Sequence, residues 1–175
     1  MSRKAQHRPS ALIAALYPSR NASRVPAMLR TAGCRVTALC ARDASLSHSW
    51  LIDRYIETTH DEAATLAALR ATVEAERFDF VAVADEALLH ALGRNLEPWM
   101  ARVLPFAATP EMCALILDKN KMLDAMERKG IPLPPSLVVR SREQLDAAAA
   151  RIGYPLVLKD AVGCGGNSVR RVDAP

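Results

Sequence analysis

YPLVLKDAVGCGGNSV, residues Tyr154–Val169, is the stretch of sequence that most constrains the fold of this chain. A short apolar run, Leu156 to Leu158, ends in Lys159, and a glycine-rich loop separates it from a second strand-forming run, Val169 to Val172. This pattern predicts strand, loop, strand. Because side chains alternate along a strand, we expect Lys159 to point away from the two leucines.

The loop between these strands contains Gly163, Gly165 and Gly166. Glycines adopt left-handed backbone angles at little cost, so their N–H groups can converge on an anion that side chains would block. A lysine beside such a loop suits a polyphosphate, although an ordinary glycine hairpin is the alternative. The pattern is not a Walker A loop, in which Gly-Lys-Ser/Thr leads into a helix.

Upstream of this stretch, predicted strands and helices alternate. Apolar runs predict strands at Ala11–Leu16, Arg35–Cys40, Arg54–Glu57 and Phe78–Val83, and helical spacing predicts helices at Ser23–Ala32, Asp61–Glu76 and from Leu88 to a stop at Gly93. This alternation is typical of a doubly wound parallel sheet with right-handed crossovers. The predicted fold class is therefore α/β.

Ligands of such sheets bind at the carboxyl ends of the strands, where Tyr17 to Arg20, Asp85 and Glu86 are expected. The first turn has no G-x-G-x-x-G motif, which argues against a dinucleotide site. Asp85 and Glu86 are candidate substrate-binding residues. The alternative is that these carboxylates only begin a helix.

After Arg102 the character of the sequence changes. We expect a last short strand and turn within Arg102–Pro110, a helix from Pro110 with Thr109 as cap, and a helix through residues 118–129 that buries Met122, Leu123 and Met126 and stops at Gly130. A strand at Leu137–Arg140 and a capping box of Ser141 and Gln144 follow. The predicted organisation is a mobile tail at 1–10, a first domain at 11–108 and a second at 109–175.

Composition narrows the possible functions. The 175 residues carry a formal charge of +4 and are half hydrophobic, which suits a packed core and an anionic ligand. Aromatic residues are few and not interleaved with basic ones, which disfavours nucleic-acid binding. No run is long enough to span a membrane. The four cysteines, Cys34, Cys40, Cys113 and Cys164, form no C-x-x-C pair and are expected to be reduced thiols of a cytoplasmic protein.

Four segments in this order resemble the N-terminal part of an ATP-grasp enzyme. They are VADEALL at 83–89, DKNKMLDAMERKGIPLPPS at 118–136, YPLVLKD at 154–160 and GCGGNSV at 163–169. The most similar members are carboxylate-amine ligases related to carbamoyl-phosphate synthetase, biotin carboxylase and D-alanine ligase. The resemblance implies a Rossmann-like pre-ATP-grasp parallel sheet followed by the first, incomplete α+β subdomain of an ATP-grasp fold.

The resemblance also implies an ATP site. Lys119 matches the family's first nucleotide lysine, which contacts a phosphate, and Lys121 is its rival for that role. Lys159 matches the second lysine, which reaches the phosphates and the edge of the adenine. Gly163, Gly165, Gly166 and Ser168 belong to the flap that closes over the triphosphate.

By the same resemblance, the intact enzyme would activate a small-molecule carboxylate as an acyl phosphate for attack by an amine. Two departures are visible. Asp160 stands where many members have proline, and the family's magnesium ligands are expected downstream of this chain. We therefore expect the chain alone to be inactive. The alternatives are a non-catalytic module that binds a nucleotide or partner protein, and an α/β sensor of a small anion.

Overall fold

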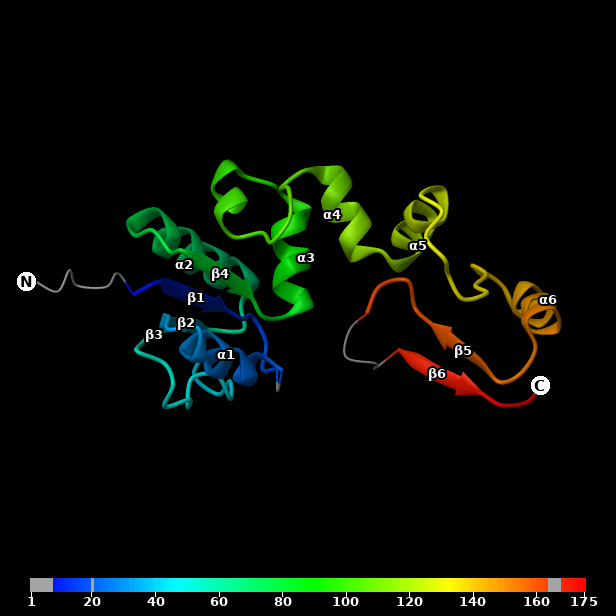
Figure 1. Cartoon of the computed structure of the whole chain (residues 1–175), viewed down its shortest axis with the longest axis horizontal. Coiled ribbons are helices and arrows are strands. Elements are labelled where there is room, and N and C mark those ends of the chain that lie inside the picture. Colours follow the sequence, from blue (N-terminus) through cyan, green and yellow to red (C-terminus); the bar gives the residue numbers. More distant parts are fainter. Residues whose placement is uncertain (1–7, 20, 164–167) are drawn as a thin grey trace, which may run out of the picture. The chain divides into compact units, whose positions relative to one another are not determined.

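The computed structural model describes residues 8–19, 21–163 and 168–175 (Figure 1). It divides the chain into two compact units, Met1–Pro110 and Glu111–Pro175. The predicted α/β class is confirmed, since unit 1 contains a parallel sheet with helices and unit 2 contains helices and a two-stranded sheet.

Unit 1 is built on a four-stranded parallel sheet. Its strands are β1 (Ser10–Ala14), β2 (Arg35–Ala41), β3 (Arg54–Thr58) and β4 (Phe80–Val83), in the order β3-β2-β1-β4. The run Ala11 to Ala14 in β1 is fully buried, as expected of a central strand covered on both faces. Because β2 and β4 lie on opposite sides of β1, the order of the strands reverses beside it.

Helices cover both faces of this sheet (Figure 1). They are η1 (Ala22–Arg24), α1 (Val25–Thr31), α2 (Glu62–Ala75), α3 (Glu86–Arg94) and η2 (Pro98–Arg102), with α1 on one side of the sheet and α2 and α3 on the other. Each predicted helix of this unit is present. However, α3 continues through Gly93 rather than ending at it.

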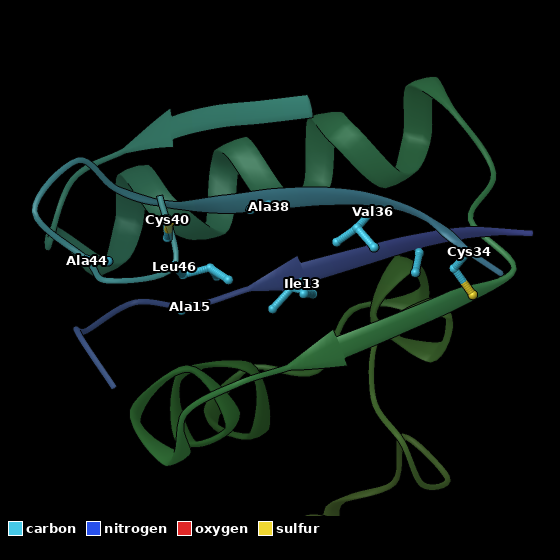
Figure 2. Close-up of a cluster of buried hydrophobic side chains, with 9 residues drawn as sticks. Ile13, Ala15, Cys34, Val36, Ala38, Cys40, Ala44 and Leu46 are labelled. Atoms are coloured by element: carbon cyan, nitrogen blue, oxygen red, sulfur yellow. The ribbon is translucent and has the colours of Figure 1, made fainter. Parts of the chain in front are cut away.

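The core on the α1 side is made largely of small side chains (Figure 2). Alternate residues of β1 and β2 share this face, and the cluster consists of Ala11, Ile13, Ala15, Cys34, Val36, Ala38, Cys40, Ala44 and Leu46. Val25 and Leu29 of α1 pack against it. Burial, with a smaller contribution from the charge of Asp43, raises the pKa of Cys40 to about 11, so this thiol stays protonated at neutral pH.

Two predictions at the ends of this unit differ from the structure. The apolar residues Val103 and Leu104 form no strand, because both of their N–H groups donate to the carbonyl of Met100 at 2.9 Å and so complete a helical turn. The predicted mobile tail, residues 1–10, includes Ser10, which begins β1. Arg8 also lies against the sheet, since its guanidinium donates to the carbonyl of Gly33 at 3.0 Å. Residues 1–7 lie outside the described residues.

Unit 2 follows the predicted order of helices and ends in the predicted strand pair. Its elements are α4 (Pro110–Leu117), α5 (Lys119–Arg128), α6 (Arg142–Ile152), β5 (Leu156–Lys159) and β6 (Val169–Val172), and β5 pairs with β6 in antiparallel register. Leu123 and Met126 are half-buried on α5, whereas Met122, predicted to face inward, is exposed.

The predicted strand at Leu137–Arg140 is absent. Its last N–H group, that of Arg140, donates instead to Oε1 of Gln144 at 2.8 Å, and Leu137 and Val138 stay exposed. The Oγ of Ser141 accepts the N–H of Gln144 at 3.3 Å, as the capping box requires. The Gln144 side chain thus accepts the N–H of Arg140, the residue before the cap, where a complete capping box would have it accept the N–H of Ser141. The segment leads into α6 without pairing as a strand.

Candidate functional site

The glycine loop, residues 163–168, extends from the ends of β5 and β6. Lys159 pairs with Val169 in the strand ladder, and the N–H of Asp160 donates to the carbonyl of Ser168 at 3.3 Å. The ladder therefore continues one step past the strands before the chain enters the loop. Of the predicted site residues in the loop, Gly163 and Ser168 are described, and Gly165 and Gly166 lie outside the described residues.

Gly163 occupies a position that requires glycine. Its φ is +151°, and a Cβ built on it would lie 2.6 Å from Oγ of Ser168. Since contacts between a Cβ and another heavy atom are normally longer than 3.0 Å, a side chain at this position would displace the Ser168 hydroxyl. The positive φ and this close approach are two reasons why glycine suits position 163.

Lys119 is attached to the same loop by both its backbone and its side chain. Its N–H donates to the carbonyl of Ala161 at 3.0 Å, and its Nζ donates to the carbonyl of Gly163 at 2.5 Å, across 44 residues of sequence. The helix begins here because the side chain of Asp118 accepts the N–H groups of Asn120 and Lys121. The amino-terminal end of α5 therefore lies at the base of the glycine loop.

Lys159 lies on the exposed side of β5. The residues of β5 alternate in exposure, with Leu156 and Leu158 half-buried and Val157 and Lys159 exposed, as the sequence predicted. Among the described residues, the Lys159 ammonium has no ion pair or hydrogen bond. Its positive charge is therefore open to solvent at the point where the strand enters the loop.

Lys121, the rival candidate, faces a different environment. It lines a cavity of about 210 Å³ between α4 and α5 together with Glu111, Ala114, Leu115, Asp124 and Arg128. Two of these lining residues are carboxylates. Of the two lysines, Lys119 is the one whose side chain is bonded to a described residue of the glycine loop.

The candidate substrate residues of unit 1 have structural roles. Asp85 is the N-cap of α3: Oδ1 accepts the N–H of Leu88 at 2.9 Å, and Oδ2 accepts the N–H of Leu16, past the end of β1, at 2.7 Å. Its two oxygens thus join a helix to the central strand, which confirms the helix-starting alternative for this residue. Glu86 is exposed in the first turn, where its charge suits the helix dipole.

A histidine that the sequence analysis missed lies at the carboxyl edge of the same sheet. Nδ1 of His60 is 3.0 Å from the carbonyl oxygen of Leu16, and Nε2 is 2.9 Å from Oδ1 of Asp43. The ring also stacks on Tyr17, with centroids 5.8 Å apart. No sequence motif connects these residues, because they follow three different strands.

The hydrogen-bond partners of His60 favour its protonated form. A carbonyl and an ionised carboxylate only accept hydrogen bonds, so both contacts are satisfied only when both ring nitrogens carry a proton. Accordingly, the carbonyl of Leu16 and then the carboxylate of Asp43 raise the pKa of His60. The hydrogen bond from His60 lowers the pKa of Asp43. The pair thus links two loops at the sheet edge and favours the protonated imidazole.

The described residues contain neither a metal-ligand cluster nor a membrane-spanning helix. Within residues 8–19, 21–163 and 168–175, no three His, Cys, Asp or Glu side chains lie close enough together to hold a metal ion. In the same described residues, no helix combines the length and the apolar character needed to cross a bilayer.

A family model and several known sequences match parts of the chain. Residues 118–174 match the family model described as carbamoyl-phosphate synthase L chain, ATP binding domain. A carbamoyl phosphate synthase large chain from Methanospirillum hungatei is 41% identical over 49 residues, which are 28% of this chain and 5% of the relative. A biotin carboxylase from Nostoc sp. is 37% identical over 70 residues, which are 38% of this chain and 15% of the relative.

Solved structures match almost the whole chain. An N5-carboxyaminoimidazole ribonucleotide synthetase in complex with ADP has a TM-score of 0.66 at 20% identity, covering 99% of this chain and 43% of the other. An L-amino acid ligase from Bacillus licheniformis has a TM-score of 0.61 at 20% identity, covering 97% and 40%. The chain thus spans less than half the length of these proteins. The ATP-grasp resemblance and the fold expected from it are confirmed.

Proposed function

We propose that this chain is the N-terminal portion of an ATP-dependent ligase and that Lys119, Lys159 and the glycine loop bind the phosphates of ATP. The intact enzyme would activate a small-molecule carboxylate as an acyl phosphate, which an amine or similar nucleophile then attacks. MgATP supplies the phosphoryl group. The protein would belong to the cytoplasm, and its magnesium ligands would lie in sequence beyond Pro175.

The observation that carries this proposal is that two lysines 40 positions apart in the sequence both lie beside one glycine loop. Nζ of Lys119 lies 2.5 Å from the Gly163 carbonyl oxygen, and Lys159 ends the strand that leads into the loop. A triphosphate carries several negative charges and needs both cations and N–H donors. In this proposal the cations come from two elements of unit 2, and the N–H donors come from the loop.

The present partner of Lys119 also suits a phosphate site. The ammonium charge assists a bond to either acceptor, but a carbonyl oxygen carries only a partial charge, whereas a phosphate oxygen carries a formal one and adds the attraction of an ion pair. A phosphate placed near Gly163 would therefore compete well for the Lys119 ammonium. The cavity between α4 and α5 offers Lys121 two carboxylates instead, which supports Lys119 as the phosphate contact.

The residues of this chain would act by positioning and by neutralising charge. Phosphoryl transfer spreads negative charge over the oxygens of the transferred group, and fixed cations stabilise that charge without reorganising. Lys159 and Lys119 would do this from two sides of the loop, while the loop would exclude water. Since both oxygens of Asp85 are used in the fold, Glu86 is the more accessible of the two candidates for a substrate contact.

Two-dimensional NMR of the 175-residue chain, titrated with MgATP to millimolar concentration, tests this proposal. We expect shifts in the amides of β5, β6 and the start of α5. Lys159→Ala and Lys119→Ala should each weaken binding at least tenfold, equivalent to about 1.4 kcal/mol.

Lys121→Ala is the matched control, because it removes the same charge from the same helix as Lys119→Ala and should leave the affinity unchanged. Equal affinity of Lys159→Ala and the unmodified chain would refute the proposed site. If small carboxylates or inorganic phosphate bound to unit 1 and MgATP did not bind at all, the small-anion sensor would be the better explanation.

A further inference from the structure

We propose that Arg171 is a further nucleotide-binding residue, which contacts the base or ribose of the nucleotide held by the glycine loop. This inference rests on the proposed function and extends it to a residue that neither a lysine motif nor a glycine motif identifies. It follows from the register of β5 and β6 together with the pattern of exposure on the two faces of this strand pair.

The register places Arg171 on the same face as Lys159. Val157 pairs with Arg171, and Lys159 pairs with Val169. Directly paired residues of antiparallel strands share a face, and so do residues two positions apart in one strand. These four side chains therefore form one surface, which is called here the open face.

The open face is exposed, whereas the opposite face is half-buried except at Arg170. Val157 and Val169 are 54% and 40% exposed, whereas Leu156, Leu158 and Val172 on the other face are half-buried. The open face thus presents two apolar side chains with a cation at each end. This combination suits a ligand that is partly anionic and partly flat and apolar.

The direction of the strands decides which part of a nucleotide Arg171 would meet. β5 runs toward the glycine loop and β6 runs away from it (Figure 1). Arg171 is two residues farther from the loop than Val169, which is about 7 Å at 3.3 to 3.4 Å per residue. If the loop holds the phosphates, a nucleotide lying along the open face brings its ribose and base to Val157 and Arg171.

The chemistry of Arg171 fits such a contact. Its Nε donates to Oδ1 of Asp173 at 2.7 Å, which holds one edge of the guanidinium and leaves its other N–H groups for a ligand. A guanidinium is planar and stacks on aromatic rings as well as donating hydrogen bonds. Val157, directly opposite, would contact the same base through its exposed methyl groups.

The neighbouring residue provides a matched control. Arg170 pairs with Leu158 and so lies on the opposite face of the same strand. Its Nη1 donates to the carbonyl of Val169 at 3.1 Å. Arg170→Ala and Arg171→Ala remove the same side chain from adjacent positions, so a difference between the two variants reports which face the ligand occupies.

The test compares MgATP with inorganic tripolyphosphate, which has the phosphates but no base or ribose, in NMR titrations of the full chain. Arg171→Ala should weaken MgATP binding about tenfold and change tripolyphosphate binding by less than about threefold. Arg171→Lys keeps the charge but loses the planar group, and it should weaken MgATP binding nearly as much. Lys159→Ala should weaken both ligands, and Arg170→Ala neither.

Each other outcome contradicts the inference in a distinguishable way. If Arg171→Ala binds MgATP as Arg170→Ala does, Arg171 is not a binding residue, while a loss in Lys159→Ala still supports the proposed function. If Arg171→Ala weakens both ligands equally and Arg171→Lys restores them, the residue acts on phosphates and the base contact is wrong. If MgATP causes no shifts in the NMR spectrum of the unmodified chain, both the proposed function and the inference are refuted.

Discussion

Replacement of Asp85 by alanine is expected to destabilise unit 1 by about 3 kcal/mol. This carboxylate joins the first turn of α3 to the chain that leaves β1, through bonds of 2.9 Å to the N–H of Leu88 and 2.7 Å to the N–H of Leu16. A residue first considered for substrate binding should therefore have a large effect on stability.

The magnitude is the sum of two losses. Removal of a helix N-cap costs about 1 kcal/mol. Leu16 is 1% exposed, so its N–H would be left buried without a partner, which costs about 1 to 3 kcal/mol. The sum, about 2 to 4 kcal/mol, is a large fraction of the 5 to 15 kcal/mol typical of a folded domain.

Urea unfolding followed by tryptophan fluorescence measures this change. Both tryptophans of the chain, Trp50 and Trp99, lie in unit 1, so the signal follows this unit alone. With a urea dependence of about 1.5 kcal/mol per molar, a loss of 3 kcal/mol lowers the unfolding midpoint by about 2 M.

Two control variants separate the losses. Asp61→Ala removes another N-cap, one whose side chain accepts only the N–H of Ala64, and it should cost about 1 kcal/mol. Asp85→Asn keeps an oxygen for the cap but turns an NH₂ group toward the N–H of Leu16, so it should lie between the two alanine variants. If Asp85→Ala cost no more than Asp61→Ala, the bond to Leu16 would contribute nothing and the reasoning would be refuted.

Two further predictions concern the sheet edge and the loop. Because the folded-state pKa of His60 lies above 6.5, its contribution to stability is full below pH 6.5 and is lost as the pH rises through the folded value. His60→Gln should therefore abolish this pH dependence of the urea midpoint of unit 1, and Asp43→Asn should reduce it. If the pH dependence were unchanged in His60→Gln, it would have to come from another group. Gly163→Ala places a Cβ 2.6 Å from Oγ of Ser168, so it should weaken MgATP binding in the NMR titration, and the added change Ser168→Ala should restore part of the loss. No difference between the single and double variants would contradict the steric argument.

Much of the fold was predictable because its signals are local. The apolar run of β1, the helical spacing of α2 and the glycines between β5 and β6 are each contained in a short window. The wrong predictions concern segments whose local sequence is compatible with two different structures. The apolar pair Val103 and Leu104 serves a helical turn as well as a strand, and only its hydrogen bonds to Met100 distinguish them.

The candidate site was predictable in part. Lys159 and the loop glycines are adjacent in sequence, so their association needed no tertiary information. The choice between Lys119 and Lys121 did need it, because both lie within one helix and face different neighbours. His60 and Asp43 carry no motif at all, and only the parallel sheet brings the loops that contain them together.

The sequence by itself determined the order of strands and helices, the glycine loop and the lysine at its edge, since these depend on periodicity and on the backbone freedom of individual residues. Tertiary structure alone decided that the Lys119 ammonium donates to the carbonyl of Gly163 and that Asp85 accepts N–H groups from both α3 and Leu16. It also decided that Arg171 lies on the same face as Lys159. The physical reason is that these contacts join residues far apart in the chain, and their partners are selected by register and packing, which no short window of sequence contains.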